Sequence, residues 1–181
     1  DRIKMIQDSG LSVRDVLRKN VDAYTELNLD DANWTNEQLL DAMAILKEKG
    51  LPVRLKMLNA EYPAEISRAA ISGIRSKIDN LELADCVVMD TTYYTDEDCM
   101  ERLARSSLII FPYQQTNESS SAAVRHAVAS GAPVAVTPLR IFEDVRDAVI
   151  RLPGARPEDL AEGIERIITW DQKQWRSYWD T

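Results

Sequence analysis

The chain has 181 residues, a length typical of one globular domain or of one domain with an appendage, and it can bury a sizeable core. It carries 22 basic and 30 acidic residues, which give a net charge of -8. Because no basic stripe is visible in the sequence, this balance argues against a nucleic-acid partner.

Cys86 and Cys99 lie in apolar patterns, and with a single histidine in the chain they form no metal-ligand spacing. A reducing compartment is therefore favoured. No apolar run reaches the roughly 18 residues of a membrane span, and no signal segment opens the chain. We expect a cytoplasmic protein without a transmembrane segment, and peripheral attachment at the inner membrane stays open. The sequence starts at Asp1, so a fragment of a longer protein is one interpretation.

The predicted elements begin with a helical segment at residues 1–34, where Ser12 can cap an amphipathic helix. Thr35 can cap a second helix, which Gly50 closes. From there the pattern predicts strands at 51–58, 86–89, 108–111, 134–136 and 148–152, and helices or helical turns that begin near Pro63, Thr95, Ser119 or Ser120, Arg140 and Pro157. Residues 171–181 form an aromatic helix or tail.

One strand, turn and helix in the middle of this series form the candidate site. The strand at 108–111 stops at Pro112, which cannot donate to a sheet ladder. The polar segment 114–121 follows, Ser119 or Ser120 can cap the next helix, and Gly131 ends that helix. Such a turn lies at the carboxyl end of a parallel strand, where open α/β sheets bind ligands and a helix N-terminus attracts anions.

The alternation of about five strands with helices predicts an α/β fold with a right-handed parallel sheet and flanking helices. We divide the chain into residues 1–34, a ligand-binding domain at 35–170, and the C-terminal stretch 171–181.

From about Thr35 to Trp170 the sequence resembles the C-terminal, donor-binding half of retaining glycosyltransferases of the GT-B fold, in particular those of the family 4 type (glycosyl transferases group 1). The most specific match is Glu118 in the turn after a strand, a helix over Ser119–Ser130, and the stop Gly131–Val134. The resemblance implies a single Rossmann-like GT-B half-domain.

The resemblance also implies which residues contact a nucleotide-diphosphate sugar. Glu118 would hold hydroxyls of the donor sugar and is the catalytic candidate. The remaining donor-binding candidates are Ser119, Ser120 and Ser121, whose amides would meet the diphosphate, together with Arg125, His126, Thr137, Tyr93 and Tyr94.

By the same resemblance, a hexosyl group passes to an acceptor glycan or lipid-linked sugar with retention of configuration, and neither a cofactor nor a metal is expected. Relatives carry a preceding acceptor-binding GT-B domain, which 181 residues cannot hold together with this one. They also open the donor domain with a strand, a glycine-rich loop and basic residues, and nothing in residues 1–35 has that pattern.

Several alternatives stay open. His126 stands where relatives commonly have a second glutamate, and surface placement is at least as good an interpretation as a ribose contact. Glu118 can be an ordinary solvated turn carboxylate. A non-catalytic GT-B-like assembly module with a degenerate donor site is the second hypothesis for the whole chain. A flavodoxin-like domain is the third, but it predicts acidic residues at the end of the first strand, which the sequence lacks.

Overall fold

The structure, a computed structural model, describes residues 36–61, 63, 65–115 and 120–179. The chain divides into two units, residues 1–34 and 35–181, and every described residue belongs to the second unit. The helix predicted after Ser12 lies outside the described residues.

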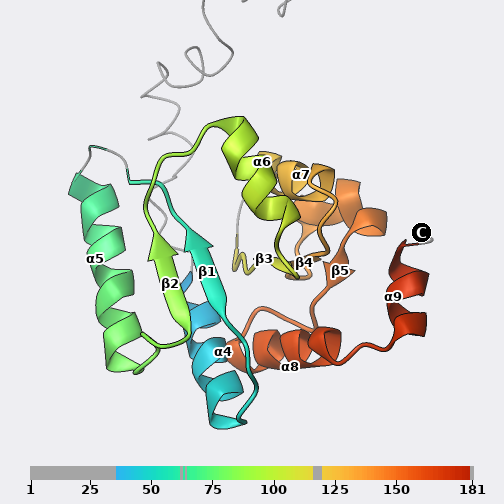
Figure 1. Ribbon diagram of the computed structural model, residues 1–181, viewed down its shortest axis with the longest axis horizontal. Helices are drawn as coiled ribbons and strands as arrows, with labels where there is room; N and C mark the ends of the chain where they lie inside the picture. Colours follow the sequence, from blue (N-terminus) through green and yellow to red (C-terminus); the bar gives the residue numbers. More distant parts are fainter. Residues whose placement is uncertain (1–35, 62, 64, 116–119, 180–181) are drawn as a thin grey trace, which may run out of the picture. The chain divides into compact units, whose positions relative to one another are not determined.

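The described unit alternates helices with short strands, as the sequence pattern predicts (Figure 1). In chain order its elements are α4 (Asn36–Glu48), β1 (Leu55–Leu58), α5 (Glu65–Asn80), β2 (Val87–Asp90), α6 (Asp96–Ala104), β3 (Ile109–Phe111), α7 (Ala122–Ala129), β4 (Val134–Val136), the 3-10 helix η1 (Arg140–Ala148), β5 (Ile150–Arg151), α8 (Pro157–Ile168) and α9 (Gln172–Trp179).

All strand pairs are parallel, which confirms the predicted α/β class, but the strands form two sheets where the sequence analysis expected one. β1 pairs with β2, and a second sheet has the order β3-β4-β5. The break lies between β1 and β3, and no strand of the described residues joins them. In a doubly wound sheet the first strand of the fold lies between these two, and the residues that precede α4 lie outside the described ranges.

Local chemistry accounts for most of the element ends. Thr95 accepts a hydrogen bond from the Asp98 N–H and caps α6, and Gly131 follows α7 with a φ of 77°. Pro157 is the first residue of α8. The predicted strand at 51–58 begins only at Leu55, because Pro52 has no N–H and the Val53 N–H donates to the Leu51 carbonyl instead of a sheet.

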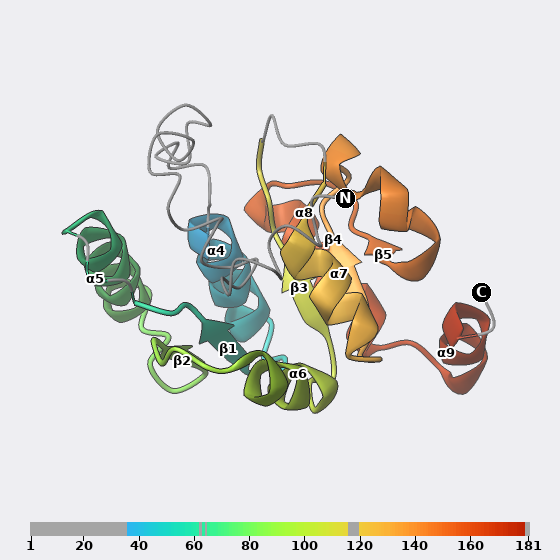
Figure 2. The same ribbon diagram turned by 90° about the horizontal axis from the view of Figure 1, so that it is seen from above.

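Two apolar clusters hold the unit together. The first joins α4, α5 and α8 to one face of both sheets, with Met57 and Ile150 among its buried members. The second lies between α7, η1 and residues of β3 and β4 such as Val134 and Val136. Alternate residues of β4 belong to different clusters, so its sheet is covered on both faces, as parallel sheets require (Figure 2).

The C-terminal helix α9 is tied to the end of the second sheet by one side chain. The Tyr178 hydroxyl accepts a hydrogen bond from the Val134 N–H and donates one to the Ala148 carbonyl, both at 3.3 Å. The Tyr178 ring also packs with Trp170 and Trp175. No helix among the described residues has both the length and the apolar character that crossing a bilayer requires.

Gly163 provides a test of the packing of α8. A Cβ at this position would lie 2.5 Å from the Leu152 side chain and 2.9 Å from the Pro153 ring. We expect Gly163→Ala to lower the free energy of unfolding by about 1 to 3 kcal/mol, because overpacking outweighs the better helix propensity of alanine. Gly73→Ala in α5 is the control, since nothing lies within 4 Å of its added Cβ, and it should raise stability by about 0.5 to 1 kcal/mol. Urea unfolding of both variants measures this, and a Gly163→Ala chain as stable as the parent would contradict it.

Candidate functional site

The start of α7 is organised by Ser121, which is the N-cap. Its backbone is extended, with φ -113° and ψ 117°, and its hydroxyl accepts a hydrogen bond from the Val124 N–H at 3.4 Å. The sequence pattern predicts Ser119 or Ser120 as the cap, which is wrong by one or two residues. A cap accepts a hydrogen bond from the amide two or three residues on, and Ser121 does so with Val124.

Tyr113 connects this helix start to the neighbouring strand. Its hydroxyl lies 3.3 Å from the Ser121 hydroxyl, and its carbonyl accepts a hydrogen bond of 2.7 Å from the hydroxyl of Thr137, which is fully buried. The Tyr113 ring packs against Phe142, with ring centroids 5.3 Å apart. Sequence reasoning missed Tyr113, and the only signal was an aromatic residue directly after the strand-ending Phe-Pro pair.

Gln114, the next residue, ties the same side of this turn to a second loop. Its side-chain amide donates to the Pro112 carbonyl at 3.1 Å and to the Ala155 carbonyl at 2.8 Å. Ala155 belongs to the loop that follows β5, so Gln114 links the loops after two strands of one sheet. The turn at 116–119, with Glu118 and Ser119, lies outside the described residues, but the residues on both sides of it are held by named contacts.

Arg125 brings positive charge to the start of α7. Its guanidinium donates to the Ser120 hydroxyl at 3.4 Å and forms an ion pair with Asp144 of η1. An anion at this helix start would therefore meet an arginine whose charge is already partly offset. His126, the next residue, is exposed, and no hydrogen bond of its imidazole is found within the described part of the chain.

A second polar group lies at the carboxyl end of β2. The Asp90 carboxylate accepts hydrogen bonds from the Tyr94 hydroxyl at 2.7 Å and the Thr92 N–H at 3.1 Å, and Lys56 lies 3.2 Å away. These partners, the Tyr94 hydroxyl first, hold the pKa of Asp90 well below its usual range. The guanidinium of Arg102 stacks 3.9 Å from the centre of the Tyr94 ring.

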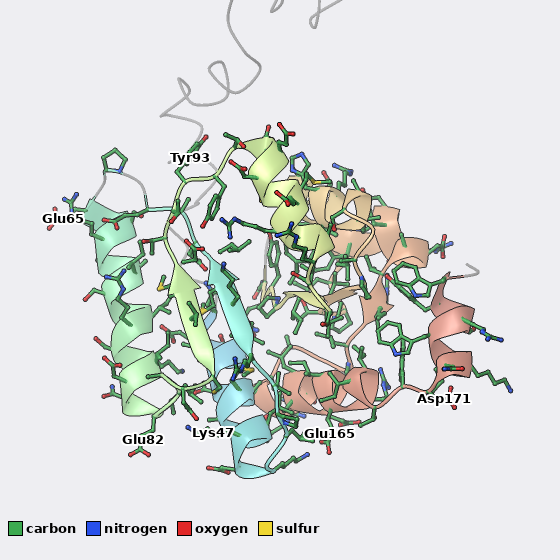
Figure 3. The ribbon with its side chains drawn as sticks, viewed as in Figure 1. Lys47, Glu65, Glu82, Tyr93, Glu165 and Asp171 are labelled. Atoms are coloured by element: carbon green, nitrogen blue, oxygen red, sulfur yellow. The ribbon has the colours of Figure 1, made fainter. Side chains whose placement is uncertain are left out.

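The structure thus brings some of the predicted residues together and leaves others apart. Ser120, Ser121 and Arg125 share the start of α7, and Thr137 reaches them through Tyr113. Tyr93 follows β2, which belongs to the other sheet, and its side chain is 47% exposed (Figure 3). The contacts of all these residues with a donor stay predictions, as does that of His126.

A cavity of about 270 Å³ lies at the opposite edge, before the amino ends of β1 and β2. Its lining includes Lys47, Arg54, Asp85 and Cys86. The Lys47 ammonium pairs with Asp85 at 2.7 Å, and burial together with the Asp85 charge raises the pKa of the Cys86 thiol. No group of three or more potential metal ligands occurs in the described ranges.

Comparison with known proteins adds one finding about the fold. No protein-family model matches the chain. Sucrose-phosphate synthase from Thermosynechococcus elongatus resembles the structure with a TM-score of 0.64 and 19% sequence identity, over 76% of this chain and 34% of that chain. The chain has a GT-B glycosyltransferase-like fold.

The similarity to curated proteins is short. Arsenate reductases from Acidiphilium multivorum and Escherichia coli strain K12 are 51% and 49% identical to the chain over 41 residues, which is 23% of the chain. The chain covers 29% of the length of each of these relatives. A match of this extent carries no statement about activity, whereas the GT-B-like fold extends over most of the described unit.

Replacement of Ser121 tests the organisation of the α7 start. Ser121→Ala removes the N-cap acceptor and the contact with the Tyr113 hydroxyl, so we expect the free energy of unfolding to fall by about 1 kcal/mol. Ser76→Ala is the matched control, because Ser76 is exposed inside α5 and only bonds back to the Ser72 carbonyl. Urea unfolding should leave that control near the parent value, and equal effects of the two substitutions would show that Ser121 is no cap.

The Asp90 cluster predicts a pH-dependent contribution to stability. A carboxyl whose pKa is lower in the folded chain than in the unfolded chain stabilises the fold at every pH above the unfolded pKa, which is about 3.9 for aspartate. This stabilisation is lost as the pH falls from that value toward the pKa in the folded chain. Asp90→Asn should therefore be less stable than the parent at pH 7, and the difference should shrink as pH falls from about 4 to 2. Urea unfolding at several pH values measures this, with Glu48→Gln as a control for the lost charge. A difference that stays constant or grows in acid would contradict the assignment.

Proposed function

We propose that this chain is the donor-binding domain of a glycosyltransferase that uses a nucleotide-diphosphate sugar. The observation that carries the proposal is the start of α7: a capped helix N-terminus that follows β3 of a GT-B-like fold, with Arg125 beside it. Unpaired amides and the helix dipole at such a position stabilise phosphate charge. Sucrose-phosphate synthase, by its name, forms a sugar phosphate ester, and this supports a sugar-transfer role for the shared fold.

In this proposal the amides around Ser120 and Ser121 bind the diphosphate, together with Ser119, and Glu118 binds hydroxyls of the sugar. The Tyr113 hydroxyl meets the Ser121 hydroxyl, so it links the two flanks of the turn that carries Glu118, and Gln114 ties the first flank to the loop after β5. On donor binding, the Arg125 guanidinium would turn part of its hydrogen bonding from the Asp144 carboxylate to the phosphate oxygens.

The proposed reaction breaks the bond between the anomeric carbon of a hexosyl group and the diphosphate oxygen, and forms a bond from that carbon to an acceptor hydroxyl oxygen with retention of configuration. The proton of the acceptor hydroxyl passes to the departing diphosphate. Negative charge develops on the departing diphosphate while the sugar becomes oxocarbenium-like, so amide donors aimed at the diphosphate lower the barrier. No step in this scheme requires a metal or a cofactor. The acceptor, a glycan or a lipid-linked sugar, would be held by an N-terminal GT-B domain.

The second candidate is a non-catalytic GT-B-like module that serves assembly. Two observations favour it: His126, in place of a second glutamate, is exposed without a described partner, and no strand of the described residues lies between β1 and β3. In relatives that position carries the strand that leads to the phosphate-binding loop. The two candidates differ in whether the isolated chain binds sugar nucleotides.

Calorimetric titration with uridine, guanosine and adenosine diphosphate sugars separates them. We expect binding by the parent chain, and a loss of about tenfold or more in affinity in Glu118→Ala, because hydrogen bonds to a charged group contribute about 1.5 to 3 kcal/mol. Glu48→Ala is the matched control, since it removes an exposed glutamate at the far end of α4, and it should bind as the parent does.

Absence of binding at millimolar concentration of all three donors, with the chain folded, would reject the donor-binding proposal and favour the assembly module. Equal affinities of the parent and Glu118→Ala would reject the role of Glu118 in particular.

A further inference from the structure

The cavity at the amino ends of β1 and β2 is separate from the start of α7. Its volume is about 270 Å³, and it is formed by the last turns of α4, the loop that leads into β1 and the residues just before β2. None of the described residues that line it belongs to β3, α7 or the turn between them. A ligand in this cavity would therefore bind whether or not the chain binds a sugar nucleotide.

One side of the cavity is apolar. Met43 of α4 is 2% exposed, and Leu51 and Val53 of the following loop are half-buried. Gly50, with a φ of 72°, ends α4, and the Leu51 N–H then donates to the Leu46 carbonyl at 3.1 Å. The carbonyls at this helix end are thus satisfied within the turn, so this wall offers mainly carbon atoms to a ligand.

The polar side of the cavity is built around Lys47. Its ammonium group donates to the Glu82 carbonyl at 2.5 Å and to the Asp85 carboxylate at 2.7 Å, and Figure 3 shows Lys47 and Glu82 at the end of the β1–β2 sheet opposite Tyr93. The hydrogen bond from Lys47 to Asp85 raises the pKa of Lys47, so the ammonium stays charged. An ammonium has three donors, and these two contacts hold it in place while one donor is left.

Arg54 supplies a charge that is not offset. It lies directly before β1, lines the cavity and is exposed, and within the described residues its guanidinium has no ion pair or hydrogen bond. With Lys47 and Asp85 the lining holds two cations and one carboxylate, so one positive charge remains. This local excess stands out in a chain whose net charge is -8.

We propose that this cavity binds a small aliphatic monocarboxylate, such as a branched acid of about six carbons. The planar fork of the Arg54 guanidinium matches the two oxygens of a carboxylate, and the remaining Lys47 donor adds a third contact. The hydrocarbon body then lies against Met43, Leu51 and Val53.

The charge and the size of the cavity limit the choice of ligand. A single negative charge balances the one positive charge left in the lining, whereas the Asp85 carboxylate repels a dianion such as phosphate. The volume of 270 Å³ equals that of about nine water molecules at roughly 30 Å³ each. An acid of about six carbons fits this space, and a nucleotide does not.

Protection of Cys86 against alkylation measures binding on the full chain. Cys86 lines the cavity and is half-buried, and Cys99 of α6 is the internal reference. Because burial holds the pKa of the Cys86 thiol above its ordinary value, labelling is carried out at about pH 9. The probe is isocaproate, and the comparison compounds are its uncharged amide, acetate and inorganic phosphate. We expect isocaproate at about 10 mM to slow alkylation of Cys86 by about tenfold, with Cys99 unchanged and clearly smaller effects of the other three compounds.

Arg54→Gln and Arg68→Gln are a matched pair of variants. Each removes one exposed arginine, and Arg68 belongs to α5, outside the cavity lining. Isocaproate affinity should fall by about tenfold or more in Arg54→Gln, because a hydrogen bond to a charged group is lost, and stay at the parent value in Arg68→Gln. Neither guanidinium has a partner within the described residues, so urea unfolding should give both variants the stability of the parent.

Four results would overturn the proposal. Absence of protection, or equal protection by isocaproate and its amide, would show that the cavity recognises no carboxylate. Unchanged affinity in Arg54→Gln would remove the residue that carries the recognition. Stronger protection by phosphate than by isocaproate would assign the cavity to another class of anion. Cys86 that resists alkylation in the free folded chain but reacts in urea would show that another part of the polypeptide covers the cavity.

Discussion

The packing of α4 against α8 is the contact on which the rest of the described unit depends. Leu40 and Leu46 of α4 and Leu160 and Ile164 of α8 are almost fully buried in one cluster. That cluster also contains residues of both sheets, which share no hydrogen-bonded strand pair. Among the described residues the two sheets therefore belong to one core through the helical layer and not through a shared strand pair, because apolar burial is non-directional.

The start of α7 is positioned by residues packed at the end of the second sheet. Thr137, at the end of β4, is fully buried, and its hydroxyl holds the Tyr113 carbonyl, while the Tyr113 hydroxyl meets Ser121. The position of the α7 start is thus set by the register of β4 beside β3. Arg125 and Asp144 add a charge pair from η1, so three separate segments converge on one helix N-terminus.

The sequence was a good guide to elements and a poorer guide to contacts. Pro112, Gly131 and Pro157 act on the backbone of their own neighbourhood, so the ends of β3, α7 and α8 follow from local chemistry. The cap of α7 was misplaced because three consecutive serines have equal capping chemistry, and only the path of the chain selects Ser121. Tyr113 and Gln114 were missed as anchors because their partners Thr137 and Ala155 are distant in sequence.

By itself the sequence determined the α/β class, the order of the helices and strands, and a polar turn after β3, because hydrophobic periodicity and the punctuation by proline and glycine are local properties. The tertiary structure decided that the strands form two sheets, that Arg125 is paired with Asp144, and that Tyr93 and Tyr94 lie at the end of a different sheet from Ser121. These facts depend on distances between segments far apart in the chain, and packing and hydrogen bonding set such distances only once the whole unit has folded.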